Sequence, residues 1–447
     1  MIKSARFFFV FLAVLPLFGQ DGFVFDKDFK KVGIPFKFIN NLIFIPIKVN
    51  GVELNFLLDS GVEETILFSM DDKQNVSFNN VEKIALKGLG SAASIEGLKS
   101  TNNILETHGF KSKNHILYIV LDQKFNISSH VGIPINGIIG CNFFKNNLVE
   151  LNYNRKKIFV HSQKNKNHIK IEKKFTKIPI TIEKSKPYLE GNVIINDNII
   201  PVKLLIDIGN SDAIWLFQNA SKKIEIPSKN FDDFLGQGFS GEVFGKRALI
   251  SNFKFSKFNF INPIVAFPDS TSTKNVKMVV NRSGSVGSEI LKRFTIVFDY
   301  SNLVMYLKKN NNYEAPFAYN KSGIEIQHNG YQWVDETIRL ENIVINRRDY
   351  EKKNDVFSND FKYKLELKPV YIISNIRKNS QAETIGLKND DVIKSINRRP
   401  AYQYSLNRIN LLLRSEEEKW LTIEVERNGI ILEFKLFIKN ANQGFKN

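Results

Sequence analysis

Two stretches of this 447-residue sequence decide its fold: NFLLDSGVEETILF at Asn55–Phe68 and KLLIDIGNSDAIWLF at Lys203–Phe217. Each is an apolar run followed by Asp-x-Gly, a short polar patch and a second apolar run. The two aspartates, Asp59 and Asp207, are 148 positions apart. Self-similarity at a fixed spacing indicates a repeated structural unit, so further paired segments are expected at the same spacing.

Two more pairs of segments occur at nearly the same spacing. They are GLGSAASIEG (Gly88–Gly97) with GQGFSGEVFG (Gly236–Gly245), and GIIGCNFFKNNLVELNYNRKKIFV (Gly137–Val160) with GSVGSEILKRFTIVFDYSNLVMYL (Gly284–Leu307). Three collinear blocks at spacings of 147 or 148 are hard to obtain by chance. The sequence therefore predicts a duplication.

The local pattern of both copies is that of β-strands. Short runs rich in β-branched and aromatic residues are separated by the turn pairs Asn50-Gly51 and Asn196-Asp197, which are typical of hairpins. We predict a mainly β, bilobal fold. Its first lobe covers residues 21–165, and its second lobe, with connecting strands, covers residues 166–350. The glycine-rich stretches are expected at hairpin tips.

An apolar strand that ends in Asp-x-Gly places a carboxylate at the strand end, where glycine lets other backbone approach. If the two lobes pack about a pseudo-twofold axis, Asp59 and Asp207 meet between them. Two carboxylates at close range cannot both ionise easily, so they share a proton. One can then act as general base on a water molecule while the other acts as acid toward a peptide carbonyl. This chemistry needs no metal and no cofactor, and we expect none.

These motifs resemble one half of a pepsin- or retropepsin-type aspartic protease, present here in two copies over roughly residues 30–310. The chain is especially similar to bacterial retropepsin-like proteases that carry a PDZ domain. The resemblance implies an aspartic endopeptidase acting on peptides or proteins. It assigns the catalytic dyad to Asp59 and Asp207, and the support of the active-site loops to Ser60, Gly61, Ile208 and Gly209. It assigns the flap to Gly88, Gly90, Gly236 and Gly238.

The second aspartate motif departs from the family pattern. It reads Asp207-Ile208-Gly209 rather than Asp-Ser/Thr-Gly. Isoleucine cannot make the hydrogen bond by which the hydroxyl braces the two loops, so half of that support is missing. The alternative function is therefore a catalytically degenerate, exported peptide-binding or scaffold protein that retains the protease fold.

The C-terminal part resembles a bacterial PDZ domain, which we expect over residues 351–442 after a charged linker at Arg347–Asp355. The resemblance rests on YIISNIRKNSQAETIGLKNDDVIKSINRRP at Tyr371–Pro400. Gln381 stands where proline is usual and Asp390 where glycine is usual, although aspartate tolerates the left-handed conformation of such a turn. A PDZ domain captures a chain end by adding it as a strand. The alternative is a packing module that rigidifies the protease.

Residues 1–20 have the pattern of a secretory signal peptide. Lys3 and Arg6 precede an apolar run from Phe7 to Phe18, which is followed by Gly19. The run is shorter than the roughly 20 residues that span a bilayer, so an uncleaved membrane anchor is the weaker alternative. We expect an exported protein, periplasmic or secreted, with no other membrane contact.

The composition excludes several other classes of protein. The chain has one cysteine and six histidines without a zinc-binding spacing. Its net charge of +17 is spread along the sequence without an arginine-rich tract, so no nucleic-acid partner is expected. Because both lobes lie in one chain, we expect a monomer whose partners are a peptide substrate and a peptide ligand of the PDZ domain.

Overall fold

The computed structural model of the chain describes residues 22–26, 29–68, 76–86, 95–121, 126–162, 171, 173–238, 241–273, 278–339, 361–415 and 417–438. It is 56% strand and 11% helix, which confirms the mainly β prediction. The predicted signal peptide at 1–20, the flap residues Gly88 and Gly90, and the linker at Arg347–Asp355 lie outside the described residues.

The first repeat, with the segment that precedes it, covers residues 22–162 and builds a sheet around Asp59. The sheet is formed by β1 (Val24–Phe25), β3 (Lys37–Ile39), β4 (Leu42–Val49), β5 (Val52–Leu58), β6 (Thr65–Leu67), β7 (Glu82–Leu86), β8 (Ile95–Thr107), β9 (Phe110–Val120) and β10 (Gly137–Ile139). Asn50 and Gly51 join β4 to β5 with φ of 48° and 93°, which confirms the predicted hairpin turn. β10 pairs in parallel with β5 and antiparallel with β6, so Asp59 follows a central strand.

The second repeat, residues 173–309, has the same pairing around Asp207. Its sheet is formed by β14 (Thr181–Glu183), β15 (Lys186–Ile195), β16 (Asn198–Asp207), β17 (Ile214–Leu216), β18 (Asn230–Gly238), β19 (Gly241–Leu249), β20 (Asn252–Phe255), β21 (Phe258–Ile261), β22 (Ile264–Pro268) and β23 (Arg282–Gly287). The β15–β16 hairpin turns at Asn196 and Asp197, again with positive φ. β23, the counterpart of β10, pairs in parallel with β16 and antiparallel with β17.

A third sheet joins the two repeats. Its strands are β2 (Lys31–Pro35), β11 (Leu148–Asn152), β12 (Lys157–His161), β13 (Thr176–Pro179), β24 (Phe294–Asp299) and β25 (Val304–Lys309). The order β13-β25-β24-β11-β12-β2 takes three strands from each repeat, with β24 and β11 paired at the centre. The strand order therefore has the twofold character that the sequence duplication predicts, and one buried apolar cluster extends through both repeats.

The paired glycines of GIIG and GSVG have a steric reason. A Cβ atom at Gly137 would collide with the carbonyl oxygen of Ile66, and one at Gly284 with that of Trp215, the equivalent residue of the second repeat. Each glycine lets β10 or β23 lie against the strand that follows the aspartate loop. These close approaches hold the two Asp-x-Gly loops in equivalent places.

The C-terminal module, residues 320–438, contains the fourth sheet. Its strands are β26 (Ile324–Arg339), β27 (Phe361–Ile376), β28 (Val392–Ile396), β29 (Arg399–Pro400), β30 (Lys419–Arg427) and β31 (Ile430–Ile438). β26 pairs with β27 along its length and contributes to a separate apolar core. The C-terminal sheet therefore begins at Ile324 and not after the expected boundary at residue 350. The reason is that β26, which precedes the charged stretch, pairs with β27, which follows it. Asp390 has φ of 68°, as expected for its turn.

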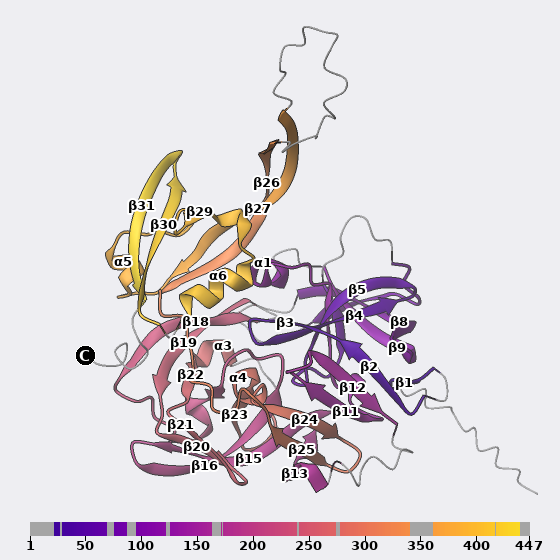
Figure 1. Cartoon of the computed structure of the whole chain (residues 1–447). Coiled ribbons are helices and arrows are strands. Elements are labelled where there is room, and N and C mark those ends of the chain that lie inside the picture. Colours follow the sequence, from indigo (N-terminus) through magenta and orange to yellow (C-terminus); the bar gives the residue numbers. More distant parts are fainter. Residues whose placement is uncertain are drawn as a thin grey trace, which may run out of the picture.

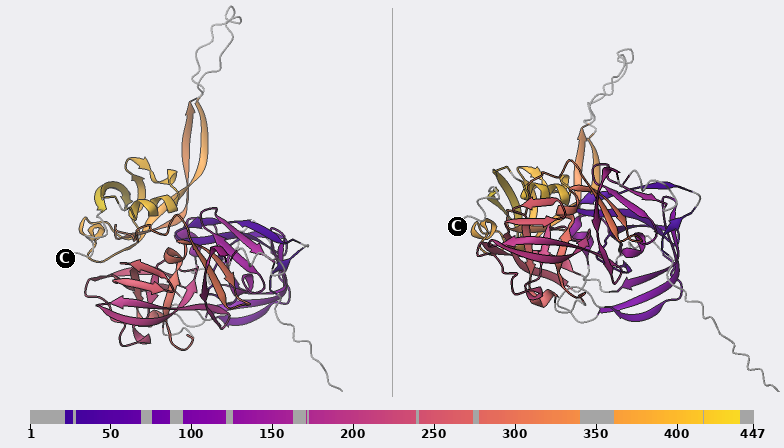
Figure 2. Two further views of the ribbon diagram at one scale, coloured as in Figure 1. Left: turned by 60° about the horizontal axis from the view of Figure 1, so that its bottom comes forward. Right: turned by 90° about the horizontal axis from the view of Figure 1, so that it is seen from below.

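The C-terminal module lies against both repeats, and its β26–β27 hairpin extends away from the body of the molecule (Figures 1 and 2). Helices are short throughout the described residues. They are α1 (Ile127–Val131), η1 (Cys141–Phe143), η2 (Gln218–Ala220), α3 (Ser270–Thr273), α4 (Ser288–Leu291), α5 (Gln381–Thr384), η4 (Ala401–Gln403) and α6 (Leu406–Leu413). Among these residues, no helix is long and apolar enough to cross a membrane.

Candidate active site

The structure brings the two predicted aspartates into contact. Asp59 follows β5 and Asp207 ends β16, and each carboxyl group lies against the glycine of the opposite Asp-x-Gly loop. The backbone N–H of Gly61 donates to Oδ1 of Asp59 at 2.7 Å. A Cβ at Gly61 would press on the carboxylate of Asp207, and one at Gly209 would overlap that of Asp59. Glycine at both positions therefore lets each carboxyl pack against the opposite loop.

Burial and mutual repulsion shape the titration of this pair. Burial, and then the charge of Asp207, raise the pKa of Asp59 well above its ordinary value. Burial also raises the pKa of Asp207, but the guanidinium of Arg282, the contact with Asp59 and the cation of Lys186 oppose that rise. A carboxyl with the higher pKa keeps its proton to higher pH. The pKa of Asp59 is therefore raised further than that of Asp207, which favours Asp59 as the carrier of the proton when the pair holds one proton.

Ser60 braces the second aspartate loop. Its hydroxyl donates to the carbonyl oxygen of Ile206 at 2.6 Å and accepts from the backbone N–H of Ile208 at 3.1 Å. The side chain of Ile208 is fully buried in the main apolar cluster. The hydroxyl-mediated brace therefore runs from the first loop to the second, while Ile208 contributes packing.

A cavity of about 1060 Å³ opens onto the dyad. Both repeats line it, and so do Arg414 and Glu325 of the C-terminal module. The predicted flap residues Gly236 and Gly238 also line this cavity, at the end of the β18–β19 hairpin. Gly236 has φ of 146° at a register shift of that hairpin, a conformation that favours glycine.

Two cations beside the dyad were not among the predicted site residues. Lys186 and Arg282 both line the cavity, and their charges lower the pKa of Asp207 against the effect of burial. Arg282 donates to the carbonyl oxygen of Gly284 at 3.1 Å and to the hydroxyl of Ser285 at 2.9 Å. In the first repeat the position equivalent to Arg282 is the buried Ile135. This difference between the two repeats is the one sign in the sequence that Arg282 has a particular role.

A second group of unpredicted residues holds the loop after Asp207. The carboxylate of Asp212 accepts from Trp215 Nε1 at 2.7 Å and from Arg247 Nη1 at 2.8 Å. Burial lowers the pKa of Arg247, but Asp212 and Asp233 raise it by more, so this arginine stays charged. Asp212 and Trp215 both lie inside the repeated stretch, but Arg247 comes from β19, which no local pattern connects to it.

The single cysteine, Cys141, is buried beside the loop that follows Asp59. Its thiol donates to the carbonyl oxygen of Glu63 at 3.2 Å, and burial raises the pKa of the thiol to about 11. Within the described ranges, no group of three or more histidine, cysteine, aspartate or glutamate side chains is placed to hold a metal ion.

Comparison with known proteins does not assign the chain to a family. No protein-family model matches it, and no curated protein sequence matches it. What the site can do must therefore be judged from its chemistry, which is that of two buried carboxyl groups with raised pKa values in the lining of a cavity.

Proposed function

We propose that this protein is an aspartic endopeptidase of the retropepsin/pepsin-like type, with two related lobes and a C-terminal PDZ-like module. One observation carries the proposal: two buried carboxyl groups, Asp59 and Asp207, stand at the ends of equivalent strands of two repeats, each against the glycine of the opposite loop, and both line one cavity. A structural carboxylate has no need of a like-charged partner. Groups whose pKa values are perturbed by burial and a like charge in a cleft are typical of catalytic sites.

The ionisation of the pair suggests the two chemical roles. Asp207, as the ionised member, takes a proton from a water molecule that attacks the peptide carbonyl carbon. Asp59, as the protonated member, donates its proton to the carbonyl oxygen, giving a tetrahedral diol. Collapse of the diol breaks the C–N bond, with a proton delivered to the leaving amine. Water is consumed, and the dyad returns to one shared proton.

An extended peptide would occupy the cavity beneath the β18–β19 hairpin. Phe234 of β18 stacks on His130 of α1, with ring centroids 5.9 Å apart, so the hairpin already touches the first repeat. Such a cover excludes water from the reacting groups and strengthens their electrostatic interactions. The apolar lining, including Leu57 and Leu205, suits apolar side chains on either side of the cleaved bond.

The remaining assignments follow from the sequence. We propose export through the N-terminal segment, to the periplasm or outside the cell, and action as a monomer on peptides or proteins. In the C-terminal module, β26 is an edge strand with α6 beside it, the kind of place where a PDZ domain adds a peptide strand. A chain end is the proposed ligand there.

Digestion of a peptide library by the purified protein tests the main proposal. We expect cleavage by the parent, and a loss of roughly 10²-fold or more in kcat for Asp59→Asn and Asp207→Asn. Asp197→Asn, on an exposed hairpin turn, is the matched control and should keep parental activity. Near-normal turnover in either dyad variant would exclude the aspartic mechanism.

A second candidate function is peptide binding without hydrolysis, and the buried Ile208 favours it because its side chain has no hydroxyl to match the brace that Ser60 provides. If no library peptide is cut, binding of the same peptides can be followed by fluorescence anisotropy. Equal binding by the parent and Asp59→Asn, without cleavage by either, would establish this function instead.

A further inference from the structure

The loop Asp207–Ala213, called here the Asp207 loop, has two polar supports that both end on the C-terminal module. The first is a chain of alternating charges. From Asp212 it passes to Arg247 at 2.8 Å, then to Asp233 at 2.6 Å, and then to Nε of Arg377 at 2.9 Å. The side chains of these four residues are only 6–14% exposed.

Arg377 is fixed by the C-terminal module itself. It directly follows β27, its backbone N–H donates to the carbonyl oxygen of Gly323 at 2.7 Å, and its Nη2 donates to that of Asn320 at 2.7 Å. Its guanidinium also lies over the ring of Phe231 in β18, 4.4 Å from the centroid. The arginine thus belongs to the module but reaches the carboxylate of Asp233 in the second repeat.

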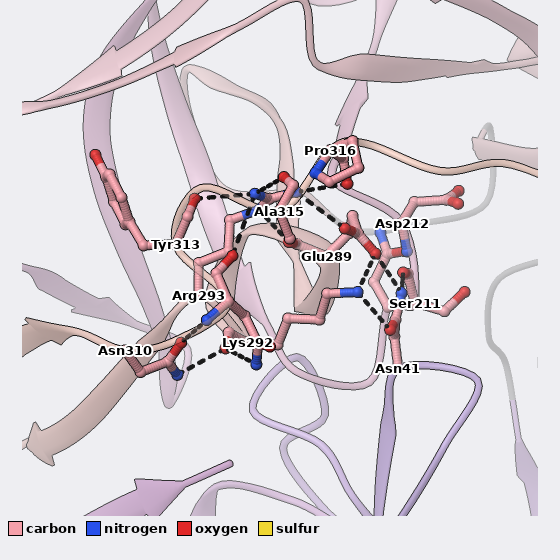
Figure 3. A network of polar contacts seen from close by, with 12 residues as sticks. Asn41, Ser211, Asp212, Glu289, Lys292, Arg293, Asn310, Tyr313, Ala315 and Pro316 are labelled. Atoms are coloured by element: carbon pink, nitrogen blue, oxygen red, sulfur yellow. Dashed lines mark hydrogen bonds and ion pairs between the residues drawn. The ribbon is translucent and has the colours of Figure 1, made fainter. Parts of the chain in front are cut away.

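The second support starts from the backbone of the Asp207 loop and is drawn in Figure 3. Nδ2 of Asn41, in the first repeat, donates to the carbonyl oxygen of Ser211 at 3.0 Å and to Glu289 at 2.7 Å. Glu289 in turn pairs with Lys292 at 2.6 Å and with Arg293 at 3.1 Å. This network ties the loop to both repeats at once.

Helix α6 of the C-terminal module holds the turn that carries Asn41. The neighbouring Asn40 donates its backbone N–H to Oδ1 of Asn407 at 3.3 Å, and its Oδ1 accepts from Nδ2 of Asn410 at 3.4 Å. Leu406 packs against Gly132, just after α1. The module therefore contacts one support through β27 and the other through α6.

We propose that the C-terminal module is a built-in positioning partner of the Asp207 loop, and that Arg377 is a positioning residue which acts on Asp207 through Asp233, Arg247 and Asp212. The expected effect of Arg377 on kcat rests on the proposed function, but its expected effect on the order of the Asp207 loop does not. The physical reason for the proposal is the asymmetry at Ile208. Ile208 lacks the hydroxyl that Ser60 supplies at the equivalent position of the first loop, and ion pairs buried at the far end of the Asp207 loop restrict its motion instead.

The alternative is that the same contacts only dock the module. Docking alone would make Arg377 matter for stability, whereas positioning makes it matter for the order of the Asp207 loop and for kcat. Removing the charge of Arg377 alone leaves the buried carboxylate of Asp233 without one of its partners. A variant that removes both charges is therefore needed as well.

The test uses the full-length protein with Arg377→Met, Arg377→Lys and the double variant Arg377→Met/Asp233→Asn. Lys394→Met is the control, because Lys394 pairs with Glu426 at 3.0 Å within the same module and is 35% exposed. Hydrogen–deuterium exchange of a peptide covering residues 207–213 reports on the loop. Hydrolysis of a short peptide gives kcat and KM separately.

We expect Arg377→Met to raise exchange in residues 207–213 and to lower kcat about tenfold or more, with KM nearly unchanged. Arg377→Lys and the double variant should recover part of both effects, and Lys394→Met should show neither. Parental exchange at 207–213 in a folded Arg377→Met variant would overturn the proposal, whether or not thermal stability falls. If the parent cleaves no peptide, the proposed function fails, but exchange still decides whether Arg377 positions the loop.

Discussion

The backbone N–H of Ile208 donates to the hydroxyl of Ser60 across the interface between the repeats, at 3.1 Å. The same hydroxyl donates to the carbonyl oxygen of Ile206 at 2.6 Å, so one serine satisfies two backbone groups of the opposite loop. Ile208 stands at the position equivalent to Ser60 but returns no hydrogen bond from its side chain. The two halves of the site are therefore supported by different means, hydroxyl bonding in one direction and apolar packing in the other.

Removing the serine hydroxyl should cost both stability and activity. In Ser60→Ala, the buried N–H of Ile208 and the carbonyl of Ile206 lose their partner, which typically costs about 1–3 kcal/mol. We expect the free energy of unfolding in urea to fall by this amount and kcat to fall with it. Ser60→Thr keeps the hydroxyl and should behave like the parent. Equal loss in both variants would show that volume, rather than the hydrogen bonds, is what matters at this position.

Restoring a hydroxyl on the other side should have the opposite effect on turnover. Ile208 is fully buried, and replacing it with threonine exchanges part of an apolar contribution of roughly 1.5–3 kcal/mol for a hydrogen bond worth about 0.5–1.5 kcal/mol. We expect Ile208→Thr to lower the melting temperature slightly or not at all and to raise kcat. Ile208→Val, which trims the side chain without adding a hydroxyl, is the control. Unchanged kcat in Ile208→Thr would mean that the missing brace does not limit the reaction.

The features that sequence alone predicted are those that local pattern determines. Asn50-Gly51 specifies its turn by backbone preference, and the Asp-x-Gly motifs recur because each must leave room for the opposite carboxyl. What sequence could not predict depends on distant segments. The pairing of β26 with β27 bridges the charged stretch, and Arg377 meets Asp233 from 144 positions away. The effect of Arg282 on Asp207 likewise exists only once the second repeat is folded.

A buried histidine should make the first repeat sensitive to acid. His115 is fully buried and bonded to the hydroxyls of Thr65 at 2.7 Å and Ser112 at 2.8 Å, and burial lowers its pKa to about 3. The unfolded chain takes up this proton near pH 6.5, so stability is complete above pH 6.5 and is lost as the pH falls toward 3. The loss should be about 1.4 kcal/mol for each pH unit in that window.

Urea denaturation between pH 7 and pH 4 measures this slope. In His115→Gln, which cannot titrate, overall stability should fall through lost packing, but the contribution of this site to the slope should vanish. His108→Asn is the control, since His108 is exposed and asparagine suits its positive φ of 46°. A parental slope in His115→Gln would show that other groups cause the acid lability.

The last prediction concerns Arg282, whose charge opposes the effect of burial on the pKa of Asp207. In Arg282→Met the largest of the contributions that oppose burial is gone, so the pKa of Asp207 rises further. If the dyad works with one ionised carboxyl, a higher pKa means that a higher pH is needed to ionise it, and the acid limb of kcat/KM should move to higher pH. Because the pair is buried, added salt should change this shift little.

Arg282→Lys keeps a cation at the cavity wall and should keep the acid limb near its parental position. The pH profile of kcat/KM on a short uncharged peptide measures both variants. The acid limb could instead stay in place in Arg282→Met, or move equally in both variants. Either result would mean that Arg282 acts on the site through its hydrogen bonds to Gly284 and Ser285, and not through its charge.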